Sequence, residues 1–238
     1  LLILMNYYIA MSQKQDIFTL MGGRVQINRG RYNPTSDAVW LAAFADAPAR
    51  TVLDVGVGTG GVALCMMAHR PSIQMTGIDI SRDMLDECGR NAALNRRDIE
   101  LIETDILTWK TDRTFDLVVT NPPYFKGTPA HHNAHHNVDL TAWTRACVKR
   151  VRPMGTFCTI VDAAVADEII CALRGRCGDI TVFPLFGGRR VAERALIRAK
   201  LGARGGMGLY SGASMNFEPV LRDGLTIDAA LATLLSKC

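Results

Sequence analysis

The stretch TVLDVGVGTGGVALCMMAH, residues 51–69, joins a short apolar run to a longer one through a cluster of glycines. Gly56, Gly58 and Gly61 fit the pattern G-x-G-x-x-G, in which glycine permits a tight turn and a close approach of the backbone to a ligand. The run before the glycines is typical of a buried strand, and the run after them is typical of a helix. The stretch therefore predicts a strand, a ligand-binding turn and a helix in succession.

The same alternation of strand and helix patterns continues along the chain. The expected strands are 74–80, 99–106, 115–121, 156–162, 179–186 and 193–200, and the expected helices are 81–95, 139–151 and 163–175. Strands that alternate with helices build a mostly parallel sheet covered on both faces. The predicted fold class is therefore α/β, with a doubly wound sheet.

A chain of 238 residues has room for one large domain. We expect a single domain over 17–238, with a leading segment (17–50), a core (51–200) and a C-terminal hairpin and helix (201–238). Within the leading segment, residues 30–44 read as a loop that feeds a helix.

Residues 1–16 form an apolar extension that carries no charge before Lys14. Its apolar part is shorter than the roughly 20 residues that a membrane span needs, and it lacks the basic region of a signal peptide. We interpret it as an over-extended start, with Met5 or Met11 as the first residue; a short apolar anchor is the alternative. Seven irregularly spaced cysteines with no Cys-x-x-Cys indicate reduced thiols in a cytoplasmic protein.

Acidic residues close three successive strand regions, at Asp54, Asp79 and Asp105. The glycine pattern alone fits either a dinucleotide or S-adenosylmethionine (SAM). SAM carries a sulfonium cation and no phosphate, so an acidic rim suits it better than a pyrophosphate. Each aspartate has a plainer interpretation as a helix cap or turn residue.

Asn121-Pro-Pro-Tyr124 follows the strand FDLVVT and would face the same crevice as the glycine loop. The prolines stiffen the turn, and Pro122 holds Asn121 extended. The Asn121 amide oxygen and a nearby backbone carbonyl are two acceptors for a planar NH2 group. Tyr124 offers a face on which a base can stack. The chemistry this predicts is transfer of the SAM methyl group to an amino nitrogen.

The order of these motifs over residues 51–162 resembles the class I SAM-dependent amino-methyltransferases with the [D/N]-P-P-[Y/F/W] motif. The resemblance implies a Rossmann-like sheet of seven strands with a terminal antiparallel strand. It implies that Asn121, the Pro122 carbonyl and Tyr124 hold the target nitrogen. It implies cofactor contacts at Asp54, Gly56, Gly58, Asp79, Ile80, Asp105 and Ile106.

A narrower resemblance covers about residues 17–200. The segment IFTLMGGRVQINRGRYNPTSDAVWLAAF, the run NPPYF and the basic stretch GGRR…AERALIRAKLG are similar to the bacterial tRNA adenine-N6 methyltransferase family. This resemblance implies methylation of an exocyclic adenine N6 in tRNA. The alternatives are the same chemistry on rRNA guanine N2, DNA adenine or a protein glutamine. A nicotinamide oxidoreductase and a nucleic-acid-binding module without activity explain fewer of the motifs.

Net charge is +4, and residues 141–204 hold twelve Lys or Arg against five Asp or Glu. We predict that the RNA backbone is bound by Arg189, Arg190 and Arg194. We also predict that Phe125 helps to bind the target base after it leaves its stack. A solvated face is the alternative for the arginines. We expect a monomer that acts on tRNA and makes no contact with a membrane.

Four histidines, at positions 131, 132, 135 and 136, follow the Asn-Pro-Pro-Tyr motif. Pairs at i, i+4 suit a metal on a helix, but the glycine, proline and asparagines around them favour a loop. We predict no metal site, because the proposed chemistry needs none. The loop either contacts RNA or is merely solvated.

Overall fold

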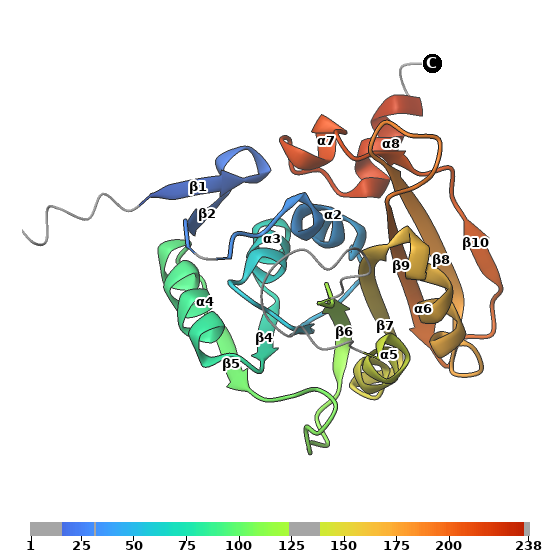
Figure 1. Cartoon of the computed structure of the whole chain (residues 1–238), viewed down its shortest axis with the longest axis horizontal. Helices are drawn as coiled ribbons and strands as arrows, with labels where there is room; N and C mark the ends of the chain where they lie inside the picture. The colour runs from blue at the N-terminus through green and yellow to red at the C-terminus, as the bar shows by residue number, and fades with distance from the viewer. Residues whose placement is uncertain (1–15, 31, 124–138, 236–238) are drawn as a thin grey trace, which may run out of the picture.

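The computed structural model describes residues 16–30, 32–123 and 139–235. Within these residues, nine strands form one twisted sheet through the middle of the molecule (Figure 1). Their order is β10-β8-β9-β7-β6-β3-β4-β5, with β11 beside β8. The strands are β3 (Thr51–Val55), β4 (Gln74–Asp79), β5 (Ile99–Glu103), β6 (Phe115–Thr120), β7 (Val151–Asp162), β8 (Cys177–Phe186), β9 (Arg194–Leu201), β10 (Met207–Leu209) and β11 (Ala213–Ser214).

The pairing of the strands confirms the predicted α/β class. The strands β3 to β7 run parallel to one another, and β9 runs antiparallel to both β7 and β8. The seven expected strands are β3 to β9, and β9 is the terminal antiparallel one.

The C-terminal segment differs from expectation. β10 and β11 each pair in parallel with β8, so the hairpin expected within 201–238 is wrong. The chain follows the edge of the sheet instead of turning back on itself. Beyond these strands lie two closing helices where one was expected.

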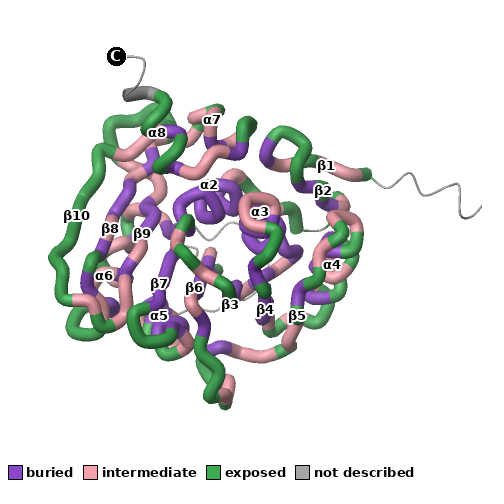
Figure 2. Tube along the Cα trace, turned by 180° about the vertical axis from the view of Figure 1, so that it is seen from behind, coloured by how far each residue is buried: buried purple, intermediate pink, exposed green. Residues whose placement is uncertain are grey.

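Two hydrophobic clusters lie on opposite faces of the sheet, because successive side chains of a strand point to opposite sides. On β3, Val52 belongs to the first cluster and Leu53 to the second. Figure 2 shows these strands buried in the centre and the exposed chain at the rim. The helices are α2 (Ser36–Phe44), α3 (Gly61–His69), α4 (Arg82–Leu94), α7 (Glu218–Leu221) and α8 (Ile227–Leu235) over the first cluster, and α5 (Leu140–Val148) and α6 (Ala166–Leu173) over the second.

Helix α2 is apolar almost all round, and it is buried almost all round. It packs against α3, α7 and α8. Trp40 is fully buried and donates its indole N–H to the carbonyl of Met215, at 3.2 Å. The leading segment and the C-terminal helices therefore cover the same face of the sheet.

An antiparallel hairpin of β1 (Ile17–Leu20) and β2 (Val25–Asn28) precedes α2 and was not expected from the sequence. Side-chain amides at the C-terminal end of α4 bind β2, the second strand of this hairpin. The Asn95 amide accepts from the backbone N–H of Gln26 at 2.8 Å and donates to the carbonyl of the same residue at 2.6 Å. Asn91 accepts from both the backbone and the side-chain N–H groups of Asn28, each at 2.9 Å.

Several predicted boundaries are shifted. The helix expected over 139–151 ends at Val148, and β7 begins at Val151 because that residue pairs with Phe115 of β6. The extension 1–16 lies outside the described residues except for Asp16. In the described part of the chain, no helix is long and apolar enough to cross a membrane.

Candidate active site

The switch point of the sheet lies between β3 and β6. These strands are parallel neighbours, and Val55 pairs with Thr120. The helix that follows β3 packs on one face of the sheet, and the helix that follows β6 packs on the other. Ligands of doubly wound sheets bind beyond the carboxyl ends of the strands at such a point. Gly56 and Asn121 leave the sheet here side by side.

The glycine loop over 56–60 adopts backbone angles that favour glycine. Gly56, Gly58 and Gly60 have φ values of 72°, 52° and 90°. Four amides of the loop, those of Gly56, Val57, Gly58 and Gly60, donate hydrogen bonds within the protein. Those of Gly56 and Val57 both donate to the carbonyl of Ile78 at 2.9 Å.

Asp79 closes β4 and accepts from the glycine loop. Its Oδ2 accepts from the amide of Gly58 at 3.0 Å, and its Oδ1 accepts from the amide of Ser81 at 2.9 Å. The carboxylate has further lone pairs for ribose hydroxyls. Next to it, the apolar side chain of Ile80 is 72% exposed, which suits contact with a flat apolar ligand surface.

Asp54 is the buried carboxyl group of the crevice. It lies one residue before the end of β3, and its Oδ2 has no hydrogen-bond partner among the described residues. Burial raises the pKa of Asp54 to about 7, and the nearby Asp79 carboxylate adds to the rise. The amide of Ala63 donates to this carboxyl group and opposes the shift. An unpartnered buried acceptor at this position suits a cationic ligand.

Asp105 and Ile106 are placed differently from expectation. Strand β5 ends at Glu103, so both residues lie in the turn that follows. Asp105 Oδ1 accepts from the amide of Leu107 at 2.9 Å, which is the plainer role considered for it. Ile106 is 4% exposed and belongs to the second hydrophobic cluster, so its side chain is not open to a ligand. The apolar side chain exposed here is that of Leu107.

Asn121 follows β6 directly and is half-buried, while Pro122 is buried and Pro123 is exposed. The structure therefore brings Asn121 and Pro122 to the switch point, as predicted. Tyr124, Phe125 and the four histidines lie outside the described residues. Among the residues that are described, no group of three or more His, Cys, Asp or Glu is placed to hold a metal ion.

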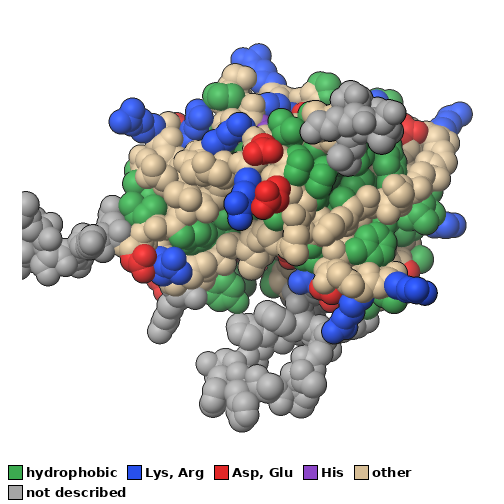
Figure 3. Space-filling model, turned by 90° about the horizontal axis from the view of Figure 1, so that it is seen from above, with side chains coloured by type: hydrophobic (Ala, Val, Ile, Leu, Met, Phe, Trp, Pro, Cys, Tyr) green, Lys and Arg blue, Asp and Glu red, His purple; other side chains and the backbone are tan. Residues whose placement is uncertain are grey.

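The three arginines predicted to grip RNA fall into two groups. Arg189 and Arg190 are exposed in the loop 187–193 between β8 and β9. Since β8 points the same way as β6, this loop lies at the carboxyl edge with Asn121. On the face seen in Figure 3, Lys and Arg side chains are dispersed among Asp and Glu and form no continuous patch.

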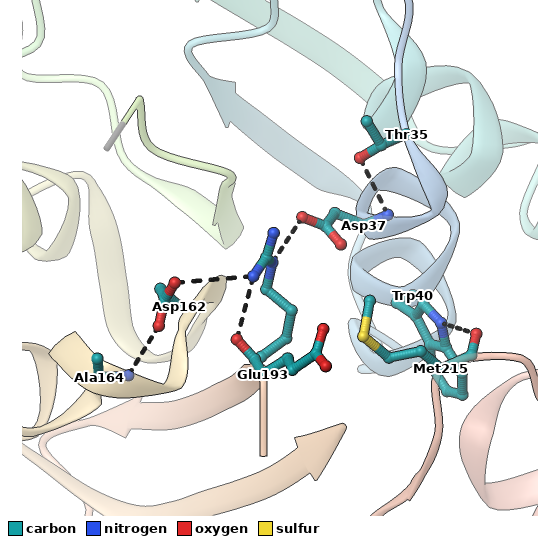
Figure 4. A network of polar contacts seen from close by, with 8 residues as sticks. Thr35, Asp37, Trp40, Asp162, Ala164, Glu193 and Met215 are labelled. Carbon is teal, nitrogen blue, oxygen red and sulfur yellow. Dashed lines mark hydrogen bonds and ion pairs between the residues drawn. The ribbon is translucent and has the colours of Figure 1, made fainter. Parts of the chain in front are cut away.

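Arg194 is committed inside the protein. Its Nε lies 3.0 Å from Asp37 Oδ2, and its NH1 lies 3.8 Å from Asp162 Oδ2 and donates to the carbonyl of Glu193 at 3.1 Å (Figure 4). Its charge is compensated by two carboxylates. The surroundings of Arg194 therefore do not support the prediction that it binds RNA. Its ion pair with Asp37 instead links α2 to the sheet.

Sequence reasoning missed several residues that shape the crevice. Pro34 packs so closely on Gly61 that a Cβ added to the glycine would lie 2.4 Å from the Cβ of Pro34. Asn91 donates to the carbonyl of Thr59 at 2.9 Å and so ties the glycine loop to α4. Trp143 of α5 donates to the hydroxyl of Thr120 at 3.1 Å. Each pairing joins residues far apart in the chain, so no local pattern signals it.

Comparison with known proteins identifies the family. The sequence model of the methyltransferase small domain matches residues 33–166. The chain belongs to this family. The predicted family and SAM as its methyl donor are thus confirmed.

Several relatives carry the name tRNA1(Val) (adenine(37)-N6)-methyltransferase. The protein of Aeromonas hydrophila subsp. hydrophila is 30% identical over 165 residues, which are 65% of this chain and 70% of that protein. The protein of Glaesserella parasuis serovar 5 is 35% identical over 107 residues, which are 43% of this chain and 45% of that protein. The chain thus spans from about half to 70% of the length of these relatives.

Solved structures confirm the fold class. A predicted O-methyltransferase of Agrobacterium tumefaciens superposes with a TM-score of 0.63 at 24% identity, over 76% of this methyltransferase and 88% of that chain. The 16S rRNA N2 G1207 methyltransferase RsmC of T. thermophilus, in complex with AdoMet and guanosine, gives a TM-score of 0.54 at 18% identity, over 74% and 47%.

The crevice of this methyltransferase fits SAM better than a dinucleotide. The amides of Gly56, Val57 and Gly58 donate to Ile78 and Asp79 and are not free for a pyrophosphate. The unpartnered buried oxygen of Asp54 and the carboxylate of Asp79 suit the positive charges of SAM. We propose Asp54, Gly56, Gly58, Asp79 and Ile80 as the residues that would hold SAM.

Proposed function

We propose that this protein transfers a methyl group from SAM to the exocyclic N6 of an adenine in tRNA. The observation that carries the proposal is the register of β3 with β6, in which Val55 pairs with Thr120. A loop that suits the methyl donor and a motif that suits an amino acceptor therefore leave the sheet as neighbours. Neighbouring strands are about 4.8 Å apart, which is close enough for one reaction to use both.

Asn121 and Pro122 have the central role in the proposed chemistry. When bound, SAM supplies an electrophilic methyl group on a sulfonium cation. The side-chain oxygen of Asn121 and the carbonyl of Pro122 accept the two N–H bonds of the target amine. This orients the nitrogen lone pair toward the donor, and most of the rate comes from that positioning. Stacking of the base on Tyr124, with Phe125 beside it, stays a prediction.

The surroundings of the crevice support a nucleic acid as substrate. The loop 187–193 joins β8 to β9 and so lies two to three strands from β6 at the same edge, a distance of about 10–15 Å at the usual strand spacing. Arg189 and Arg190 are exposed on it and suit contacts with phosphates. The relatives named as tRNA methyltransferases support tRNA as that nucleic acid.

We further propose a cytoplasmic monomer that uses no metal. Each cysteine in the described part of the chain is a free thiol, as expected in a reducing compartment. Asn121 and the glycine loop come from one chain, so the site needs no second copy. The expected absence of a metal follows from the chemistry alone.

The test is transfer of a tritiated methyl group from SAM into unmodified bulk tRNA, followed by nucleoside chromatography. A labelled N6-methyladenosine peak is expected. Asn121→Ala should reduce turnover at least tenfold while SAM binding stays near normal, because the hydrogen bond accepted by the Asn121 side-chain oxygen is lost in the transition state. Asn216→Ala, an exposed asparagine near the C-terminal helices, is the control and should keep full activity.

The outcomes separate the substrates. No incorporation into tRNA by a protein that binds SAM would reject tRNA and lead to rRNA, DNA and release factors in that order. More than about a tenth of the activity in Asn121→Ala would reject the assigned role of Asn121.

A further inference from the structure

A buried hydroxyl group links the carboxyl ends of β3 and β6. Thr120, the last residue of β6, is 1% exposed and donates its hydroxyl to the carbonyl of Val55 at 2.8 Å. Val55 is the last residue of β3, directly before the glycine loop. Thr120 directly precedes Asn121. This hydrogen bond therefore joins the residue before the donor loop to the residue before the acceptor motif.

The same hydroxyl group is held from a third element. The indole Nε1 of Trp143 donates to the Thr120 hydroxyl oxygen at 3.1 Å. A hydroxyl can donate once and accept as well, so both bonds coexist and fix its rotation. Trp143 lies in the first turn of α5, whose N-cap Asp139 accepts from the amide of Ala142 at 3.0 Å. This N-cap stabilises the first turn of α5 and so helps to fix the position of the Trp143 indole.

The indole ring also contacts the glycine loop. A Cβ added to Gly56 would lie 3.7 and 3.8 Å from two carbons of the six-membered ring of Trp143. These are ordinary van der Waals distances, so the ring lies against the open side of the glycine. Trp143 is half-buried, and it touches the donor loop with its ring and the acceptor strand with its N–H.

We propose that Trp143, acting through Thr120, is a positioning residue that holds the glycine loop and the Asn121-Pro122 motif at a fixed separation. Methyl transfer needs donor carbon and acceptor nitrogen aligned within a few tenths of an ångström, so a small change in this separation lowers the rate. The proposal rests on the proposed function for the kinetic part of its test. The binding part of the test uses SAM alone, so its result does not depend on which molecule accepts the methyl group.

The kinetic part compares two substitutions of Thr120. Thr120→Val keeps the shape and removes the hydroxyl, so kcat should fall about tenfold, the equivalent of one lost hydrogen bond at a critical position. The KM for SAM should change less than about threefold, because the loop itself is intact. Thr120→Ser retains the hydroxyl and should restore kcat to within about threefold of the original.

The binding part needs no methyl acceptor. The chain has three tryptophans, and Trp143 is the one against the glycine loop. SAM binding should change the tryptophan fluorescence, and Trp143→Phe should abolish that change. Trp109→Phe is the matched control; Trp109 is half-buried beneath the guanidinium of Arg150 and should leave both the fluorescence change and kcat intact.

The third test compares the effect of the double substitution on kcat with the effects of the two single substitutions. Because the two residues act through one hydrogen bond, Thr120→Val should reduce kcat little further in a Trp143→Phe background. A purely structural role for Trp143 predicts lower melting temperatures with unchanged kcat in the folded protein, and that result would overturn the proposal. A fluorescence change that persists in Trp143→Phe would also overturn it. If tRNA is not methylated at all, the proposed function fails, and the fluorescence result alone decides this inference.

Discussion

Asp37 and Arg194 lie 157 positions apart in the chain and meet in an ion pair of 3.0 Å. Asp37 is in the first turn of α2, and Arg194 opens β9. The pair fastens the helix of the leading segment to the antiparallel end of the sheet. It lies at the carboxyl edge, where Asp162 ends β7 beside β6. The leading segment is therefore attached where the substrate must bind.

Removing this pair should destabilise the fold. The Asp37 side chain is 12% exposed and that of Arg194 is 30% exposed, so Arg194→Ala leaves a largely buried carboxylate without its strongest partner. We expect a loss of about 1–2 kcal/mol in the free energy of unfolding, between the values for exposed and buried pairs. Urea unfolding measures it. Arg82→Ala is the control, since its pair with Asp86 is exposed; an equal loss in both variants would contradict the importance of burial.

Asp54 should make stability depend on pH. Burial raises its pKa from 3.8 to about 7, so the folded state binds the proton more tightly than the unfolded state. The stability from this group is fully present below its unfolded pKa and is lost as pH rises through about 7. Asp54→Asn has no such titration. The free energy of unfolding of the variant minus that of the original protein should therefore increase by about 2–3 kcal/mol between pH 5 and pH 8.

Urea unfolding of both proteins at the two pH values, without SAM, tests this expectation. Taking the difference between the two proteins cancels the contributions of other groups. These include Asp116, whose pKa is lowered by the amides of Thr51 and Arg50 and by Arg152 against the effect of its burial. A difference that stays constant with pH would show that Asp54 is already charged in the folded protein at pH 5.

Two glycines should respond to alanine in opposite directions. At Gly61, a Cβ would lie 2.4 Å from that of Pro34, so Gly61→Ala should cost about 1–3 kcal/mol of stability through overpacking. At Gly89, inside α4, the nearest atom is a methyl carbon of Leu101 at 3.7 Å. Gly89→Ala should therefore stabilise the protein by about 0.5–1 kcal/mol. Thermal unfolding of both variants measures the signs, and two losses of similar size would contradict the assignment.

Arg189 and Arg190 should contribute to RNA binding through charge alone. Replacing both with alanine should weaken binding and lower the slope of log K against log[salt] by about one unit for each lost phosphate contact. Filter binding of bulk tRNA across a salt series measures it. Arg96→Ala, an exposed arginine just before β5 at the opposite edge of the sheet, should leave the slope unchanged. An equal effect there would indicate diffuse attraction rather than a contact.

The parts of the fold and site that could be predicted are those encoded by neighbouring residues. Asp79 ends a strand, the glycine loop and Asn121-Pro122 each follow one, and the parallel sheet brings strand ends together. The burial of Ile106 could not be read in this way, because it depends on where β5 ends. Neither could the pairing of Arg194, because its partner Asp37 belongs to another element. From the sequence alone, an arginine is interpreted as a free positive charge that can bind a ligand.

The amides on α4 have a consequence for the hairpin of β1 and β2. Asn95 gives Gln26 one donor and one acceptor, the same two groups that an adjoining strand would give. Asn91 occupies the backbone N–H of Asn28 in the same manner. An open strand edge invites pairing with another molecule and so promotes aggregation. On β2, two side chains occupy these positions, so this edge of the hairpin is shielded from pairing with a foreign strand although no third strand adjoins it.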